Sequence, residues 1–398
     1  MALRAAAARW LARLEPPPRV VDWSLLAVVL AEAATGLASF TVGVPAGWPL
    51  FWLHRALGLA FVALLGWKLA RVGGRLTDRD RWVPSTVLSA LTLVAAVGTL
   101  ATGVAWVFGL DVRLSYWTLL SVHVGFGLAL VPLVAAHAST RARRPRLADT
   151  EGRRDALRLA VLLGAGVLAY RAQGVLNAAL DTAGADRRFT GSQPREGAGN
   201  ASFPVTSWVA DDPDPIDRDA YRLAVSGLVA TPTNFAVDPA AGGIGGGEGS
   251  GGGEGSGGGE SGGDGGVTGG AGDVPTVESD AARALLDCTS GWYTVQRWAG
   301  VRVGDLLAAA GGPTGDAAWV RFVSVTGYRW SLPLAEAEDA LLATRVGGEP
   351  LSHGHGAPVR LVAPGRRGFQ WVKWVTRVEV RAERDPAQWV VTLVSGFD

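Results

Sequence analysis

Cysteine, lysine and histidine are all scarce in this chain of 398 residues. Its single cysteine, Cys288, excludes an intramolecular disulfide, so this side chain is a buried small hydrophobe, a reactive thiol or a metal ligand. Only two of its 37 basic residues are lysines, and its arginines are spread over many loops, which argues against nucleic-acid binding. Three of its five histidines stand inside apolar segments, where an ionisable side chain is costly and usually functional.

Long apolar runs crowd into the first 180 residues. Five of them are long enough to cross a bilayer as helices of about 20 residues. They lie near Trp23–Val42, Phe51–Ala70, Val83–Phe108, Trp117–Ala138 and Leu157–Leu176. The last run is the weakest, because charged and polar residues such as Arg158 and Arg171 interrupt it. We expect residues 1–180 to form an all-α transmembrane bundle of about five helices.

Arginines flank these runs on one side of the predicted membrane. They fill the N-terminal segment and the loops after the second and fourth runs, whereas the other two loops carry only Asp111 and Arg113. The positive-inside rule therefore predicts a multi-pass membrane protein with a cytoplasmic N-terminus and an extracytoplasmic C-terminal part. The pair Arg153-Arg154 before the fifth run resembles a twin-arginine export signal, and the alternative is that it only marks a cytoplasmic loop.

Two of the apolar runs repeat one spacing pattern. The matched positions are His54, Gly58 and Lys68 in one run and His123, Gly127 and His137 in the other. Residues 14 apart lie about 21 Å apart along a helix and on nearly the same face. Each helix thus presents a residue near each leaflet, and His54 and His123 share the outer level. Neutral imidazoles are common haem ligands, so this pair predicts one shared haem b.

The pattern resembles the membrane cytochromes b in which two helices of a four-helix bundle hold two stacked haems, with three of the four ligands present. Two other interpretations stay open. An inner haem could be bound by His137, alone or with Lys68, or the histidines could make only polar contacts between helices. Two charged residues in the same runs are further candidates. Glu32 is a proton or quinone-site residue or the partner of an arginine, and Arg55 is such a partner or a ligand for a haem propionate.

The composition becomes soluble and acidic from about Gly191 onward. From Arg195 to the end there are 25 acidic residues against 16 basic ones. The tract 242–272 is mostly glycine with serine and glutamate, which predicts a flexible insertion that buries no core. We therefore expect a membrane bundle over 1–180, a linker over 181–199 and a second domain over 200–398 that contains this insertion.

Two stretches of the second domain carry a family resemblance. LDCTSGWYTVQRWAGVRVGDLLAAAG, which contains Cys288, resembles the molybdenum-ligating segment of the sulfite oxidase family. GGEPLSHGHGAPVRLVAPGRRGFQWVKWVTRVEV resembles the segment of that family that anchors the pterin cofactor, and YRLAVSGLVATP resembles its opening strand and turn. The resemblance implies an α+β molybdopterin-binding fold and an oxidoreductase activity.

The resemblance also implies roles for single residues. Cys288 would ligate molybdenum through its thiolate, a soft ligand suited to this metal. The residues that would seat the pterin phosphate are His355, Arg360, Gly365, Gly368 and Lys373. A phosphate needs fixed cationic donors and close backbone approach, which these residue types provide. Tyr328 and Arg329 are candidate catalytic residues around the substrate, with Arg297 as a further arginine.

Alternatives remain for several of these residues. Arg360 and Lys373 could be solvated charges at a strand edge, although apolar neighbours such as Val372 and Trp374 argue against it. His353 and His355 could form a separate metal-binding pair.

Together these features predict a membrane-anchored, molybdenum-dependent oxidoreductase. Its extracytoplasmic molybdenum centre would exchange electrons with a membrane haem b, and through it with quinone or another carrier. The substrate would be a small oxyanion, or a sulfoxide or N-oxide if the enzyme is a reductase fed by quinol. An alternative of another class is a non-catalytic membrane receptor or assembly factor that keeps the fold.

Overall fold

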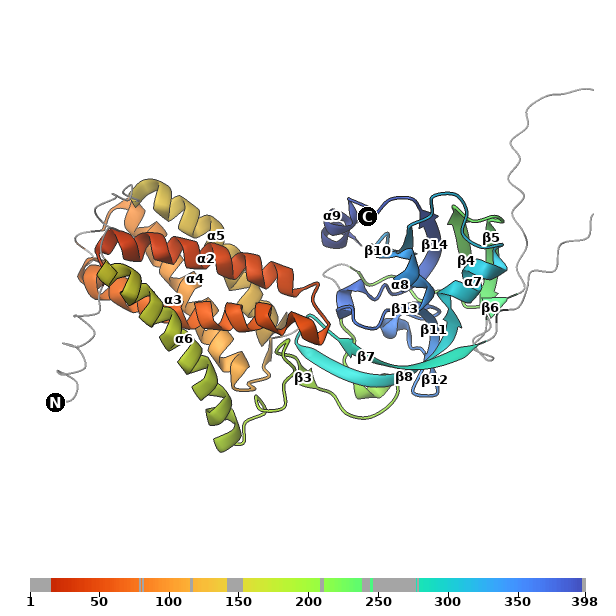
Figure 1. The fold of residues 1–398 in the computed structure, drawn as a ribbon, viewed down its shortest axis with the longest axis horizontal. Coiled ribbons are helices and arrows are strands. Elements are labelled where there is room, and N and C mark those ends of the chain that lie inside the picture. Colours follow the sequence, from red (N-terminus) through yellow and green to blue (C-terminus); the bar gives the residue numbers. More distant parts are fainter. Residues whose placement is uncertain are drawn as a thin grey trace, which may run out of the picture. The chain divides into compact units, whose positions relative to one another are not determined.

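A computed structural model describes residues 16–78, 80, 82–114, 117–141, 153–207, 211–237, 244–245, 277 and 279–395 (Figure 1). Its contacts divide the chain into two compact units. The helical unit is Met1–Pro194 with Thr289–Trp292, and the sheet unit is Arg195–Cys288 with Tyr293–Asp398. The predicted insertion at 242–272 lies outside the described residues, except for Ile244–Gly245.

Five long helices make up most of the helical unit (Figure 1). They are α2 (Pro18–Ser39), α3 (Trp48–Thr77), α4 (Pro84–Val107), α5 (Leu119–Arg141) and α6 (Arg153–Ala179). The first three each carry a proline in the first turn, where its missing N–H costs nothing. A one-turn helix η1 (Pro45–Gly47) precedes α3, and a short hairpin of β1 (Arg113–Leu114) and β2 (Trp117–Thr118) precedes α5.

Four of the described helices are long and apolar enough to cross a membrane: α2, α3 with η1, α4 and α5. The fifth predicted run lies in α6, which is helical over 27 residues but does not meet the same standard. Large aliphatic side chains such as Leu30, Leu91 and Val94 are exposed on the helices that do. An apolar outer surface of this kind is compatible with a lipid environment.

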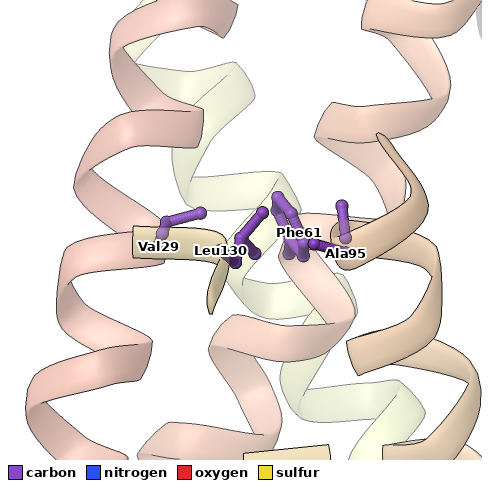
Figure 2. Close-up of a cluster of buried hydrophobic side chains, with 5 residues drawn as sticks. Val29, Phe61, Ala95 and Leu130 are labelled. Atoms are coloured by element: carbon purple, nitrogen blue, oxygen red, sulfur yellow. The ribbon is translucent and has the colours of Figure 1, made fainter. Parts of the chain in front are cut away.

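The interior of the helical unit is built from interleaved side chains of α2, α3, α4 and α5. Val29, Phe61, Ala95 and Leu130 come from these four helices and form one buried cluster (Figure 2). Small residues let the helices approach closely nearby. A Cβ at Gly98, for example, would lie 2.9 Å from the ring of a phenylalanine on α5. The four helices therefore form a packed bundle, with α6 packed against α3.

Two sheets form the core of the sheet unit. The first has the strand order β10-β9-β14-β4-β5-β6, and the second contains β12-β11-β8 with β13 beside β11 and β7 beside β8. The strands of these sheets are β4 (Arg222–Gly227), β5 (Thr233–Val237), β6 (Ile244–Gly245), β7 (Asp280–Asp287), β8 (Trp292–Arg302), β9 (Trp319–Ser324), β10 (Arg329–Pro333), β11 (Leu341–Val346), β12 (Glu349–Pro350), β13 (Arg360–Val362) and β14 (Val375–Arg381), whereas β3 (Gln193–Pro194) belongs to the helical unit.

The described pairings are antiparallel except for β14 with β4. Burial alternates along β4 and β5, as expected for strands with one face on a core. Short helices connect the strands: η4 (Asn200–Ser202), α7 (Val303–Ala309), α8 (Leu334–Glu338), η5 (His353–His355), η6 (Gly368–Gln370) and α9 (Gln388–Val394). This architecture confirms the predicted α+β class.

Candidate functional site

Cys288 lies directly after β7, in the turn before β8. Its Sγ is 3.4 Å from the Oγ1 atom of Thr206. A backbone bridge joins Asp287 to Arg367, and the Arg367 guanidinium contacts both the Asp287 carboxylate at 2.9 Å and the Cys288 carbonyl at 3.3 Å. A Cβ at Gly368 would lie only 3.1 Å from the Cys288 Cα. The cysteine is therefore fixed against the backbone of η6, which comes from the second predicted motif.

Arg360 is buried beside two tryptophans. Its guanidinium lies 5.2 Å from the ring centre of Trp298 and 5.9 Å from that of Trp371. Its Nη1 donates to the His355 carbonyl at 2.9 Å. The buried Nε of Arg360 and the buried Nε1 of Trp371 have no hydrogen-bond partner among the described residues. Burial lowers the pKa of Arg360 to about 10, against the opposing effect of Cys288.

Lys373 is the second cation of this region. Its Nζ donates to the carbonyls of Gly354 at 2.6 Å and Thr206 at 2.8 Å, and lies 3.2 Å from Ser207 Oγ. Burial, and then the charge of Arg360, lower the pKa of Lys373 to about 7, against the effects of Cys288 and two aspartates. All the hydrogen-bond acceptors described for this ammonium are neutral.

Gly356 brings the two cations together. Its φ of +104° is in the left-handed region, and a Cβ there would lie 3.0 Å from the Cβ atoms of both Arg360 and Lys373. Gly365, with φ +83°, makes the turn that leads to η6. Gly365 was predicted from the sequence and Gly356 was not. Both adopt a left-handed backbone conformation that favours glycine.

His355 supports this arrangement from within the protein. Its Nε2 lies 3.2 Å from the Phe203 carbonyl, and its Nδ1 lies 2.7 Å from the Ser352 hydroxyl. Because a carbonyl only accepts, Nε2 carries the proton and Nδ1 accepts from Ser352. Burial, and then Arg360 and Lys373, lower the pKa of His355 to about 4, so the ring is neutral at physiological pH.

Other predicted residues have partners elsewhere in the sheet unit. The Tyr328 hydroxyl donates to the Phe369 carbonyl, one residue after Gly368. Arg329 lies on β10 and contacts the Asp385 carboxylate at 2.6 Å. Arg297 is exposed on β8.

The two histidines of the HGH sequence bond to different carbonyls. His353 Nε2 lies 2.8 Å from the Pro213 carbonyl, whereas His355 Nε2 contacts Phe203. In the part of the chain that the structure describes, no group of three His, Cys, Asp or Glu side chains could hold a metal ion. The arrangement lends no support to a separate metal-binding pair.

Several residues around Cys288 were not predicted from the sequence. Trp298 and Trp371 stand inside the two motifs, so their positions were available as a signal. Thr206 was not, because it lies in an irregular segment 82 residues before the cysteine that it contacts.

These residues fit an anionic, phosphate-bearing cofactor with a metal near Cys288. Arg360 and Lys373 form no ion pair within hydrogen-bond reach among the described residues. A buried donor without an acceptor costs about 1–3 kcal/mol, and more if it is charged. A phosphate would supply an acceptor to the Arg360 Nε and a counter-charge to Lys373, whose described acceptors are all neutral. The two cations therefore fit a pyranopterin phosphate.

The helical unit brings His54 and His123 together, with ring centres 6.4 Å apart and ring planes at 85°. Two imidazoles that bind one metal ion between them, each at about 2 Å, have ring centres roughly 6 Å apart, which is close to the separation observed here. His54 Nδ1 contacts the Glu32 carboxylate at 2.7 Å and the Thr35 hydroxyl at 2.9 Å. His123 Nδ1 contacts the Thr99 carbonyl at 2.9 Å.

These contacts fix the useful tautomer of both rings. A carbonyl or carboxylate accepts the Nδ1 proton, which leaves the Nε2 lone pair of His54 and of His123 for a metal. Metal-bound histidines usually have this second contact. The two side chains thus fit the axial positions of one haem.

The residues predicted for an inner haem are arranged differently. His137 Nδ1 lies 3.3 Å from the Ser89 hydroxyl. Lys68 Nζ is 2.5 Å from the Asp22 carboxylate, which makes this amine a partner in an ion pair. A charged ammonium has no lone pair for a metal. The structure thus favours the outer pair over an inner site that contains Lys68.

Comparison with known proteins finds that part of the sheet unit is similar to molybdopterin-binding oxidoreductases. The family described as an oxidoreductase molybdopterin binding domain matches residues 277–389. Mitochondrial sulfite oxidase of Mus musculus is 40% identical over 123 residues, which cover 28% of this chain and 22% of that protein. The uncharacterized oxidoreductase YuiH of Bacillus subtilis is 34% identical over 107 residues, 26% of this chain and 54% of its own.

A third relative is a reductase by name. The catalytic subunit of the protein-methionine-sulfoxide reductase MsrP of Xanthomonas axonopodis is 31% identical over 121 residues, 26% of this chain and 37% of its own. The chain thus spans about a fifth to a half of the lengths of these relatives. The matches confirm the predicted molybdopterin-binding domain and its oxidoreductase class.

Proposed function

We propose, from the premise that this chain carries a molybdopterin-binding oxidoreductase domain of the sulfite oxidase type, that it is a membrane-anchored molybdenum enzyme. In this proposal its molybdenum centre exchanges electrons with a haem b in the helical unit, and through it with quinone or another carrier. The observation that carries the proposal is the position of Cys288 beside two buried cations that lack a carboxylate partner.

The chemistry at the site would be oxygen-atom transfer, which the bound molybdenum cofactor supplies by a two-electron change. The residues of the chain bind and orient it. The Cys288 thiolate would ligate the metal, and Arg360 and Lys373 would bind the phosphate of the pterin. Neutral His355 orients Arg360 through its carbonyl and adds no charge to the site. The tryptophans around Arg360 exclude water and so strengthen its attraction for an anion.

Two substrate classes follow from the relatives. Similarity to sulfite oxidases supports oxidation of a small sulfur oxyanion, whereas similarity to a protein-methionine-sulfoxide reductase supports reduction of a sulfoxide. Both substrates are small sulfur-centred acceptors or donors of one oxygen atom. The two activities differ in the direction of electron flow, which an assay in each direction resolves.

The membrane part of the proposal is supported by four helices of sufficient length and apolarity. His54 and His123 would hold the haem, which would supply one-electron transfer. The positive-inside pattern predicts that the sheet unit is extracytoplasmic, and the twin-arginine resemblance at Arg153-Arg154 remains a prediction, since those side chains lie outside the described ones.

The test uses the full chain purified in detergent. Molybdenum is measured by mass spectrometry, haem by the dithionite-reduced optical spectrum, and activity with sulfite plus ferricyanide and with methionine sulfoxide plus a reduced viologen. We expect about one molybdenum per chain, a b-type spectrum and activity in one direction. Folded protein that binds no molybdenum would instead support the non-catalytic receptor or assembly factor.

A further inference from the structure

The segment that follows α6, residues 187–191, packs against α3 next to His54 and against the end of α4. The Phe189 carbonyl accepts a hydrogen bond from Arg55 Nη2 at 3.3 Å, and the Gly191 carbonyl accepts one from Trp106 Nε1 at 3.1 Å. The Phe189 ring also packs edge-on against that of Phe51, with centres 5.4 Å apart. This segment is therefore tied to both α3 and α4, within the helical unit.

Arg187 of this segment packs on a tryptophan ring, but two of its guanidinium nitrogens lack a hydrogen-bond acceptor. Its guanidinium lies 4.8 Å from the ring centre of Trp106. Its Nε and Nη2 atoms are buried and have no hydrogen-bond partner among the described residues. Burial, and then the charge of Arg55, lower the pKa of Arg187 to about 10, and Asp111 offsets this only in part. The like charges of Arg187 and Arg55 are thus close enough to repel each other.

Such an arrangement is stabilised by an anion. Each guanidinium presents a planar fork of N–H donors that matches a carboxylate. Glu32, an acidic side chain on α2, contacts His54, and Asp111 offsets the effects on Arg187 only in part. An anionic ligand would supply the acceptors that the buried Nε and Nη2 of Arg187 lack among the described residues.

The position of the pair identifies the ligand. Arg55 is the residue after His54 on α3. Arg187 packs on the ring of Trp106, which lies three residues after Gly103 on α4. A Cβ at Gly103 would be 2.9 Å from the His123 ring. Both cations therefore lie within about one helical turn of the two proposed axial ligands.

We propose that Arg187, together with Arg55, binds the propionate carboxylates of the haem b that His54 and His123 hold. This inference rests on the proposed function, because it requires that haem. It assigns to the segment after α6 the role of closing the haem site with a pair of salt bridges.

The neighbouring Arg188 is the matched control. It has the same charge and lies in the same segment, but its Nη2 donates to the Gly43 carbonyl at 3.4 Å and its guanidinium stacks on Phe189 at 5.3 Å. Arg188 is thus engaged with the protein itself, and its substitution should leave the propionates bound.

The test compares haem b with its dimethyl ester, which lacks the two negative charges. The full chain is stripped of haem in detergent and reconstituted with each form, and haem loss to an excess of a haem-scavenging protein is followed optically. Wild-type protein should lose the ester at least about tenfold faster, since the ester cannot make charge-assisted hydrogen bonds to the two arginines. Arg187→Gln should lose most of this preference and the double variant Arg55→Gln/Arg187→Gln all of it, whereas Arg187→Lys should keep more of it than Arg187→Gln and Arg188→Gln should keep all of it.

The possible failures are distinguishable. Wild-type protein that binds neither form contradicts the proposed haem function. Wild-type protein that binds both forms equally well overturns this inference alone and needs no variant. A preference for free haem that is as large in Arg187→Gln as in wild type also overturns it. Equal binding of both haems, with an anionic phospholipid that wild type retains through detergent washes and Arg187→Gln loses, would assign the pair to a lipid headgroup instead.

Discussion

Two groups of basic residues in the sheet unit differ in how their charges are balanced. Arg321 and Arg329 contact the Asp385 carboxylate at 3.2 and 2.6 Å, and Arg321 also pairs with Glu379. We call these four residues the closed network. Arg360 and Lys373, the open pair, contact only neutral protein groups within hydrogen-bond distance. The two arginines of the closed network are neutralised by carboxylates of the protein. The open pair has no such carboxylate within hydrogen-bond distance, which is what we propose for cations that bind an anionic ligand.

The ionisation of each group reflects its balance. Burial alone would raise the pKa of Asp385, but the backbone N–H of Ala387 and the two arginines lower it below the usual value. The pKa of Lys373 falls to about 7 because burial is not compensated by a nearby carboxylate bond. The carboxylates thus stabilise the charges of Arg321 and Arg329 in the folded chain, whereas in the proposed function the cofactor phosphate would stabilise those of Arg360 and Lys373.

The largest effect should come from the residue that the open pair surrounds. Cys288→Ser replaces a soft thiolate by a hard, weakly acidic hydroxyl, so turnover should be abolished while the circular dichroism spectrum and melting temperature stay close to those of wild type. Turnover is measured with sulfite and with methionine sulfoxide. Full activity of purified Cys288→Ser toward either substrate would exclude Cys288 as the molybdenum ligand.

The same distinction between occupied and available groups applies to the histidines of the bundle. His54→Ala and His123→Ala should each remove the same b-type absorbance, because each deletes one axial Nε2 of a shared iron. His137→Ala should spare it and serves as the control. Loss of all haem in His137→Ala with retention in His54→Ala would show that the ligands are paired wrongly here.

Substituting one arginine from each group compares them directly. Arg360→Met should lower the molybdenum content of folded protein about tenfold or more, since charge-assisted bonds to phosphate are lost. Arg329→Met should keep the molybdenum content but lower the free energy of unfolding by about 1–3 kcal/mol, since Asp385 loses one of its donors. Metal analysis and urea denaturation give the two quantities. Equal effects of both variants on metal content would remove the distinction between the groups.

The last effect is a pH dependence of the cofactor-free protein, which leaves its activity and metal content aside. The folded pKa of Lys373, about 7, lies below that of a free lysine, so between about pH 7 and 10 the unfolded chain binds more protons and stability rises with pH. Lys373→Met should flatten this rise, and bound cofactor should suppress it, because a phosphate favours the charged amine. Urea denaturation at several pH values measures the trend. An unchanged slope in Lys373→Met would assign it to other groups.

Local patterns predicted much of this molecule. The motifs around Cys288 and Lys373 predicted that these residues share one site, and the structure brings both into contact with Thr206. The repeated 14-residue spacing predicted His54 and His123 at one level, and the structure places their rings 6.4 Å apart. The helices begin within a few residues of the expected apolar runs, and prolines occupy the first turn of three of them.

What the sequence did not reveal depends on partners that are far away along the chain. Arg329 looked like a substrate-binding arginine because its partner Asp385 is 56 residues distant. His355 was predicted to donate a hydrogen bond to the phosphate, but its Nε2–H donates to the carbonyl of Phe203, which lies 152 residues earlier. A motif identifies which residue types are present, whereas the tertiary contacts decide which of their atoms are still available.

The scarcity of lysine gives the open pair a further consequence. The chain has only two side-chain amines, and Lys68 is engaged by Asp22 at 2.5 Å. With a pKa of about 7, Lys373 is largely neutral, and hence nucleophilic, at pH 8 in the cofactor-free protein. An acylating reagent would therefore label this one side chain in preference to the other, and a bound phosphate would protect it. The extent of acylation of Lys373, measured by mass spectrometry of the peptide that contains it, would thus report how much of the protein holds the proposed cofactor.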